Sequence, residues 1–170
     1  MTSTEPSRGL GEVLRTSDGV DLQFLRSYDV GVEEVWSAIV EPARMERWIG
    51  RWSGDPASGE VEFHMTSEEG APPAPVQVTA CEAPRHLAVT MPGPEGAWPV
   101  ELTLTEDGGR TSLRFVHHLA EPYDASSVGP GWHYYLDRLG AVVAGAPVPD
   151  DFDAYYPRLA DAYAVPPGPA

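Results

Sequence analysis

The sequence contains no lysine and no asparagine, and all 11 of its cationic side chains are arginine. The absence of lysine excludes Schiff-base catalysis, a lysine general base and any phosphate-binding loop that requires a lysine. The single cysteine, Cys81, excludes an internal disulfide and a metal site built from several cysteines. No apolar run is long enough to span a membrane, and residues 1–11 lack the apolar segment of a signal peptide. We therefore expect a soluble, cytoplasmic protein.

Acidic residues outnumber basic residues by 26 to 11, which makes the formal charge −15. Nucleic acids and anionic membranes attract basic surfaces, so this charge argues against either as a partner. Hydrophobic residues fill 42% of the 170 positions, which suits one folded core rather than two. We expect a single domain over residues 12–164, with a flexible N-terminus at 1–11 and a disordered, proline-rich tail at 165–170.

The N-terminal part of the chain has the pattern of a β-hairpin followed by two helices. Two strand-like runs, 12–16 and 20–28, flank a Ser-Asp-Gly turn. A helix is expected over 32–40, because apolar residues recur there at intervals of three and four and acidic residues occupy the first turn. Pro42 suits the first turn of a second, short helix over 42–48.

The middle of the chain has the pattern of an antiparallel sheet. Apolar and polar residues alternate in five runs, at 60–65, 76–81, 86–91, 100–105 and 112–117. A period of two buries one face of each strand. The Glu-Asp-Gly-Gly segment at 106–109 predicts a tight hairpin between the last two runs. On the outer face, we expect Glu101 and Arg114 to form a cross-strand ion pair.

A long helix is expected to cover the buried face of this sheet. From Gly131, one apolar stripe follows helical spacing and consists of Trp132, Leu136, Leu139 and Val143. We interpret Ser126-Ser127 as the capping region that precedes this helix, and we expect Asp137 and Arg138 to form ion pairs at its surface. A further helical segment is expected over 151–164. Helices gathered on one side of an antiparallel sheet define the α+β class.

Four sequence motifs follow one another in a distinctive order. They are an Arg-bearing strand with Glu-Glu-Val-Trp, Pro-Ala-Arg and a tryptophan over 26–48, Glu-Ala-Pro-Arg-His-Leu at 82–87, the strand at 109–117, and Gly-Trp-His-Tyr-Tyr-Leu-Asp-Arg-Leu at 131–139. This order and spacing resemble the START-like helix-grip (SRPBCC) superfamily, in particular bacterial proteins with the domain named for the activator of Hsp90 ATPase. The chain departs from that family at Val30-Gly31-Val32, where the family has Ala-Pro-Pro.

The resemblance implies a helix-grip fold, also called START-like or Bet v 1-like. In this fold a curved antiparallel sheet wraps around a long C-terminal helix, and two short helices follow the first strand. The resemblance also implies a cavity between the sheet and that helix, where superfamily members bind lipids, polyketides, hormones or other apolar molecules. Some members are cyclases or aromatases. The eukaryotic chaperone activator has an additional N-terminal domain for which this chain has no room, so we expect no Hsp90 interaction.

Residues on the apolar faces of the sheet and the long helix are the predicted lining of a ligand pocket. They are Trp48, Phe63, Met65, Val89, Met91, Trp98, Leu102, Phe115, His117, Trp132, Tyr135, Leu136 and Leu139, and Trp52 is expected at the border. Aromatic side chains suit a ligand site because they offer a large apolar area. For any one of these residues, ordinary core packing is the simpler interpretation. The resemblance favours a pocket for the set.

His117 and Arg26 are the candidates for catalysis. His117 follows Leu113 and Phe115 on one strand face, so its imidazole should point inward and is able to bind a ligand or transfer a proton. The alternative is a core histidine with structural hydrogen bonds. Arg26 shares a face with Phe24 and Tyr28, and if buried it requires a carboxylate or an anionic ligand.

We expect neither a metal site nor a cofactor. His64, His117, His118 and His133 are the histidines considered for zinc, but they are expected on different faces and have no zinc-like spacing. Cys81 should face outward without an activating histidine, which argues against a nucleophile.

The sequence therefore predicts binding of a small hydrophobic or aromatic molecule rather than catalysis. One alternative is a cyclase- or aromatase-like enzyme that uses the same cavity, because such reactions depend on holding a reactive chain in shape. Another is a chaperone-associated or regulatory interaction module, which requires an exposed apolar patch. The identity of the ligand and the oligomeric state stay open, with a homodimer as one alternative.

Overall fold

The computed structural model of the chain describes residues 11–17, 19–64, 73–93, 96–120 and 125–150. The elements, in chain order, are β1 (Glu12–Arg15), β2 (Gly19–Tyr28), α1 (Val32–Val40), α2 (Pro42–Met45), β3 (Arg51–Ser53), a 3₁₀ turn (Pro56–Ser58), β4 (Glu60–His64), β5 (Ala74–Glu82), β6 (His86–Gly93), β7 (Gly96–Asp107), β8 (Arg110–Ala120) and α3 (Ala125–Ala144). Each alternating run forms a strand, as predicted, and β3 is an additional strand of three residues. The predicted helical segment at 151–164, residues 1–10 and the tail at 165–170 lie outside the described residues.

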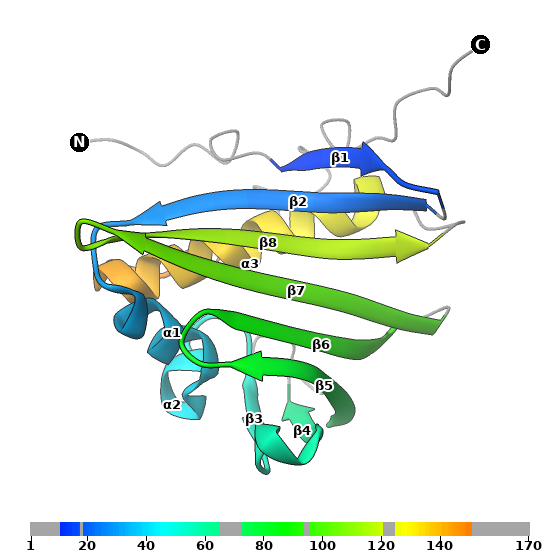
Figure 1. Cartoon of the computed structure of the whole chain (residues 1–170), viewed down its shortest axis with the longest axis horizontal. Coiled ribbons are helices and arrows are strands. Elements are labelled where there is room, and N and C mark those ends of the chain that lie inside the picture. The colour runs from blue at the N-terminus through cyan, green and yellow to red at the C-terminus, as the bar shows by residue number, and fades with distance from the viewer. Residues whose placement is uncertain (1–10, 18, 65–72, 94–95, 121–124, 151–170) are drawn as a thin grey trace.

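The strands form one antiparallel sheet of eight, in the order β1-β2-β8-β7-β6-β5-β4-β3. Strands β3 to β8 follow one another as neighbours, and β8 then returns to pair with β2 along its whole length. Helices α1 and α2 connect β2 to β3 at the far edge of the sheet. Figure 1 shows the curved sheet with α3 crossing behind it and α1 beside one end of α3. This arrangement is the predicted α+β helix-grip fold.

Helix α3 begins earlier than the sequence indicates. It starts at Ala125, so Ser126-Ser127 lie within its first turn rather than before it, and the prediction of a separate capping region is wrong. Pro130 lies inside the helix and removes one backbone donor there. In the sequence, Gly129, Pro130 and Gly131 interrupt the helical pattern, which therefore favours a helix that starts at Gly131. In the structure Pro130 is buried and the helix continues through it.

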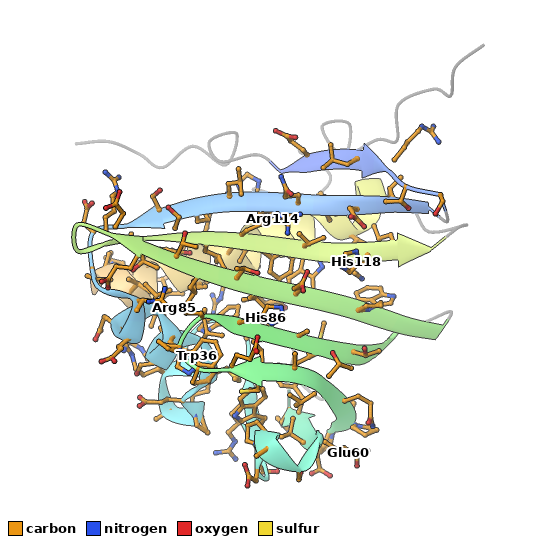
Figure 2. All side chains as sticks on the ribbon, viewed as in Figure 1. Trp36, Glu60, Arg85, His86, Arg114 and His118 are labelled. Carbon is orange, nitrogen blue, oxygen red and sulfur yellow. The ribbon has the colours of Figure 1, made fainter. Side chains whose placement is uncertain are left out.

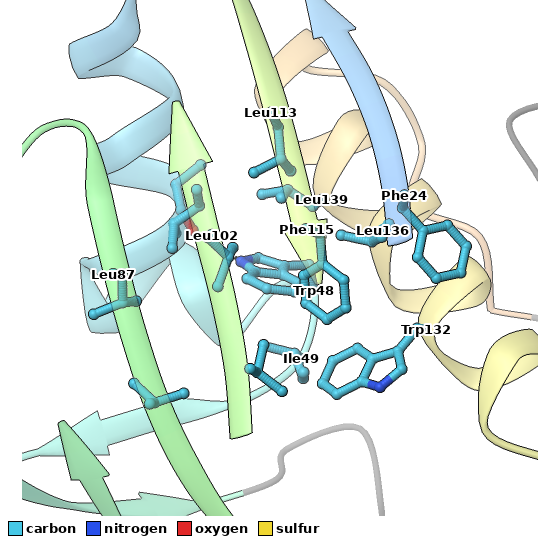
Figure 3. Close-up of a cluster of buried hydrophobic side chains, with 14 of the residues drawn as sticks. Phe24, Trp48, Ile49, Leu87, Leu102, Leu113, Phe115, Trp132, Leu136 and Leu139 are labelled. Carbon is cyan, nitrogen blue, oxygen red and sulfur yellow. Dashed lines mark hydrogen bonds between the residues drawn. The ribbon is translucent and has the colours of Figure 1, made fainter. Parts of the chain in front are cut away.

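The core lies between the concave face of the sheet and α3. Figure 3 shows Leu113 and Phe115 of β8 beside Leu136 and Leu139 of α3, and all four side chains are at most 2% exposed. Phe24 of β2 is fully buried in the same cluster. These residues occupy the positions that the period of two in the strands and the helical stripe predict, because each pattern has a single apolar face.

Helix α1 is capped from another part of the chain. Its N-cap residue is Gly31, which has no side chain to accept a backbone hydrogen bond. Glu106 of β7 takes this role, since its Oε1 accepts from the backbone N–H of Val32 at 2.6 Å. A Cβ atom on Gly31 would lie 3.0 Å from the same oxygen, so glycine leaves room for the cap. At Val30-Gly31-Val32, where the sequence differs from the family pattern, the helix is thus capped by a carboxylate 74 positions later in the chain.

The expected ion pair between Glu101 and Arg114 does not form. The register of β7 and β8 places Val116 opposite Glu101 and places Thr103 opposite Arg114, which separates the two side chains along the sheet. Glu101 instead contacts His86 at 2.7 Å, and Arg114 donates to the amide oxygen of Gln23 at 2.9 Å. The prediction was wrong because alternation identifies the face of a residue but not its partner on the next strand.

Asp137 and Arg138 were expected to form ion pairs at the surface of the helix. In the structure both side chains instead contact neighbouring elements. Asp137 is 12% exposed and faces the sheet, where its carboxylate lies 3.6 Å from the Arg26 guanidinium. Arg138 donates to backbone carbonyls, including those of Trp48 at 2.9 Å and Arg47 at 3.2 Å. The helix therefore uses both side chains to hold neighbouring elements in place.

Candidate functional site

An apolar cavity lies between the concave face of the sheet and the helices. Every described residue that lines it is hydrophobic: Ile39, Met45, Trp48, Ile49, Trp52, Phe63, Val76, Leu87, Val89, Met91, Val100, Leu102, Phe115 and Trp132. Its volume is about 70 Å³. Pockets that hold drug-sized ligands have roughly 300–1,000 Å³, so this cavity fits a small molecule or requires its side chains to move for a larger one.

Several predicted pocket residues line this cavity and others do not. Those that do are Trp48, Phe63, Val89, Met91, Leu102, Phe115 and Trp132, together with Trp52, which was expected at the border. Those that lie elsewhere are Trp98, His117, Tyr135, Leu136 and Leu139, of which Leu136 and Leu139 are fully buried core residues. Met65 lies outside the described residues.

Six further residues line the cavity and were not predicted from the sequence: Ile39, Met45, Ile49, Val76, Leu87 and Val100. The period of two offered a signal for Leu87 and Val100, because each lies two positions from a predicted lining residue on the same strand face. Ile39 belongs to the apolar face predicted for the first helix. Met45 and Ile49 gave no such signal, since helix α2 has only four residues and no measurable period.

Three tryptophans and Phe115 form much of the cavity wall. The ring centroids of Phe115 and Trp132 are 4.7 Å apart, and Figure 3 shows these two rings beside Ile49. The indole N–H of Trp48 donates to the carbonyl oxygen of Ala38 at 2.8 Å, while Arg138 holds the carbonyl oxygen of Trp48 itself. The position of Trp48 is thus determined from two sides, by α1 and by α3.

Two methionines, Met45 and Met91, face the same cavity. A methionine side chain is unbranched and adapts readily to a change in the shape of its surroundings. The wall therefore combines a hydrogen-bonded tryptophan with side chains that are able to rearrange around a ligand.

His117 lies next to the cavity wall rather than in it. It is fully buried on the concave face of β8, as predicted, and its Nδ1 accepts a hydrogen bond from the indole N–H of Trp132 at 2.9 Å. Burial, with a smaller contribution from the charge of His118, lowers the pKa of His117 from 6.5 to about 4. The imidazole is consequently neutral at neutral pH.

Arg26 belongs to a second polar group, which is separate from the cavity lining. The carboxylate of Asp137 lies 3.6 Å from Arg26 and 3.6 Å from the imidazole of His133, which is fully buried. Burial raises the pKa of the neighbouring Tyr28, on which the charges of Arg26 and Asp137 act in opposite directions. Arg26 thus points inward, as predicted, and has the carboxylate partner that a buried guanidinium requires.

The outer face of the sheet carries a chain of histidines and carboxylates. His118 Nδ1 contacts Asp21 at 2.7 Å, and Glu101 lies between His118 and His86, at 4.0 Å and 2.7 Å respectively. Figure 2 shows His86 and His118 on this face of the sheet. Within the described part of the chain, no group of three or more His, Cys, Asp or Glu residues is arranged to hold a metal ion.

Cys81 is exposed, but it does not lie on the outer face that the alternation predicts. A register shift between Val78 and Ala80 pairs Cys81 with the cavity-lining residue Leu87, so both residues share the concave face of the sheet. Desolvation, together with the charge of Asp55, raises the pKa of its thiol. A raised pKa reduces the fraction of reactive thiolate, so the environment of Cys81 does not activate it as a nucleophile. No helix within the described residues is long and apolar enough to cross a membrane.

A curved antiparallel sheet that wraps around a long C-terminal helix, with an apolar cavity between them, defines the helix-grip class of proteins. The family model described as Activator of Hsp90 ATPase homolog 1-like protein matches residues 29–144. This match covers more than half of the chain, and the chain belongs to that family. No curated protein matches the sequence.

Solved structures share the fold over most of the chain. CalU16 from Micromonospora echinospora is 29% identical, with a TM-score of 0.73 over 92% of this chain and 96% of that chain. The protein encoded by BPP1335 from Bordetella parapertussis is 26% identical, with a TM-score of 0.69 over 96% and 94%. DynU16, a protein of the dynemicin biosynthetic locus, is 20% identical, with a TM-score of 0.58 over 76% of this chain and 50% of that chain, and shows the fold alone.

Proposed function

We propose that this protein binds a small hydrophobic or aromatic molecule in the cavity between the sheet and helix α3. The observation that carries this proposal is the composition of the wall. Every described lining residue is hydrophobic, and five of them are aromatic: Trp48, Trp52, Phe63, Phe115 and Trp132. A water molecule needs two to four polar partners, and this lining offers it none. An apolar ligand gains free energy from leaving water and from contact with the rings.

The position of the polar groups favours binding over catalysis. An acid–base enzyme requires a titratable group that touches the reacting atoms and has a pKa near the working pH. His117 lies outside the cavity lining, and its Nδ1 lone pair already accepts a hydrogen bond from Trp132. Its pKa of about 4 is far below neutral pH. Arg26 is engaged by Asp137 outside the cavity lining. A cyclase- or aromatase-like reaction in this cavity would therefore depend on the shape of the wall more than on proton transfer.

The interaction-module alternative receives little support from the surface. Among the described residues, the exposed large hydrophobic side chains are Leu14 and Leu25, at 41% and 60% exposure. They lie on β1 and β2, where the register places Leu14 opposite Asp21 and Leu25 opposite Arg114. A docking surface for a chaperone or regulator requires a contiguous apolar patch.

Native mass spectrometry and a thermal-shift screen of hydrophobic metabolites test the proposal. A compound at 100 times its Kd stabilises the folded state by about 2.7 kcal/mol, which corresponds to a rise in Tm of roughly 5–10 °C for a domain of this size. We expect at least one apolar compound to give such a rise and to be retained in the gas phase as a 1:1 complex.

Matched variants show whether the compound occupies the cavity. Val89→Phe adds a ring to the cavity wall on β6, whereas Ser112→Phe adds the same ring to the exposed outer face of β8. We expect Val89→Phe to abolish the rise in Tm, Trp132→Ala to change it, and Ser112→Phe to leave it intact. Equal responses in all these variants, or no stabilising compound in the screen, would contradict binding in the cavity.

A further inference from the structure

His117 lies outside the cavity lining, next to three residues that belong to that lining. On β8 it follows Phe115 by two positions and shares the concave face with it. On the neighbouring strand β7 its paired residue is Val100, and from α3 it accepts the hydrogen bond of Trp132. Phe115, Val100 and Trp132 all line the cavity. These three side chains therefore separate the cavity from the imidazole, and a ligand in the cavity reaches His117 when they move.

The hydrogen bond from Trp132 determines which nitrogen of His117 carries the proton. An indole N–H is a donor only, so Nδ1 of His117 must accept with a lone pair. A neutral imidazole has one N–H, which must then be on Nε2. Full burial of the side chain, which also lowers its pKa to about 4, keeps the ring neutral at neutral pH. His117 therefore presents a fixed N–H donor at Nε2.

This donor has no hydrogen-bond partner among the described residues. Its neighbour is the indole ring of Trp98, with ring centroids 4.8 Å apart at an angle of 52°. An aromatic ring is a weak acceptor at best. A buried donor without an acceptor carries a cost in free energy that an incoming oxygen relieves.

We propose that the ligand of this protein is an apolar or aromatic molecule with one neutral oxygen acceptor, a carbonyl or a phenol, and that Nε2–H of His117 binds this oxygen. The inference rests on the proposed function and defines the class of ligand more narrowly. A carboxylate is excluded from the class, because burial of an anion beside a hydrophobic wall costs more than one neutral N–H returns. A pure hydrocarbon fills the cavity but leaves the donor unsatisfied.

Two pairs of probes of equal shape test this inference. Acetophenone and α-methylstyrene differ only in a carbonyl oxygen against a methylene group, and 2-acetylnaphthalene and 2-isopropenylnaphthalene form the same pair with a second ring. Affinities are measured by titration of the full-length protein with NMR detection. We expect each ketone to bind about five- to tenfold more tightly than its hydrocarbon partner, the ratio that one net hydrogen bond of this kind gives.

Three variants assign the preference to His117. We expect His117→Leu, which has no donor, to bind ketone and hydrocarbon equally, and His117→Gln, whose amide both accepts and donates, to keep the preference. His118→Gln is the matched control, since it changes the neighbouring imidazole on the exposed outer face. In the wild-type protein, the ¹⁵N signal of His117 Nε2 should show the protonated tautomer and should shift with the ketones only, a readout that does not depend on how well the variants fold.

Each other outcome overturns the inference in a distinct way. Equal affinities of ketone and hydrocarbon for the wild-type protein would show that the Trp98 ring already satisfies the donor, and the proposed function would stand. A preference that persists in His117→Leu would assign the oxygen to another residue. Failure of all four probes to bind would contradict the proposed function together with this inference.

Discussion

Burial of His117 makes the free energy of unfolding depend on pH in a defined window. Burial of the side chain, more than the charge of His118, lowers the pKa of His117 from 6.5 to about 4 in the folded protein. In the unfolded chain the imidazole is solvated and has its ordinary pKa near 6.5. Between these two values the unfolded chain binds a proton that the folded protein does not bind. Stability therefore rises with pH across this window.

The direction and size of the effect follow from the two pKa values. The contribution of His117 is fully present above pH 6.5, is lost as the pH falls toward 4, and stays constant below that, where both states carry the proton. At about 1.4 kcal/mol for each pKa unit, the complete loss is roughly 3 kcal/mol, of which about 2.5 kcal/mol is lost between pH 7.5 and pH 4.5.

Urea unfolding of the wild-type protein and of His117→Gln, followed by tryptophan fluorescence, measures this contribution. All other titrating groups are common to both proteins, so the difference between their free energies of unfolding isolates His117. We expect this difference to become about 2.5 kcal/mol less favourable to the wild-type protein when the pH is lowered from 7.5 to 4.5. A difference that stays constant with pH would refute the assignment of a neutral, buried imidazole, and with it the tautomer derived from the bond to Trp132.

Three further substitutions test how the cavity wall is held in place, and chemical denaturation measures each. Glu106→Ala removes the carboxylate that accepts from the N–H of Val32 and should lower the free energy of unfolding by about 1 kcal/mol. An unchanged value would show that solvent caps the helix equally well. Arg138→Met loses the charged hydrogen bond to the carbonyl of Trp48 and should cost roughly 1.5–3 kcal/mol, and a neutral effect would contradict its role in fixing that indole. Leu136→Ala empties a fully buried core position outside the cavity lining and should cost about 2–5 kcal/mol while the preference for ketone probes persists; loss of that preference would show that core and cavity are not separate.

The fold followed from sequence patterns that report a single buried face. The runs with a period of two predicted the long strands, and the same pattern placed His117 inside. It placed Cys81 on the wrong face, because the register shift between Val78 and Ala80 interrupts the alternation in β5. Strand β3 has three residues, too few for a period to appear. The start of α3 was predicted too late in the chain. Pro130 normally interrupts a helix, and the sequence pattern does not show the packing that lets the helix continue through it.

The cavity lining was harder to predict from the sequence. A cavity forms where side chains do not fill the space between elements, and a sequence pattern shows which face is apolar but not how completely it is filled. Leu136 and Phe115 have equally apolar positions in the sequence pattern, yet Phe115 lines the cavity and Leu136 fills the core. The partners of Glu101 could be predicted only with knowledge of the register between strands. Those of Arg138 are backbone carbonyls, which every residue has, so the sequence does not indicate which of them it binds.

The central claim is that a small apolar molecule binds between the sheet and α3, and methionine methyl NMR with a bound probe tests it most directly. The chain has four methionines, and Met45 and Met91 both face the cavity. With ¹³C-methyl methionine and 2-acetylnaphthalene, we expect intermolecular NOEs from the probe to the methyl groups of Met45 and Met91 and to the indole of Trp132. A probe that binds with NOEs only to outer-face residues such as Leu25, or that leaves both methyl signals unchanged at saturation, would contradict the claim.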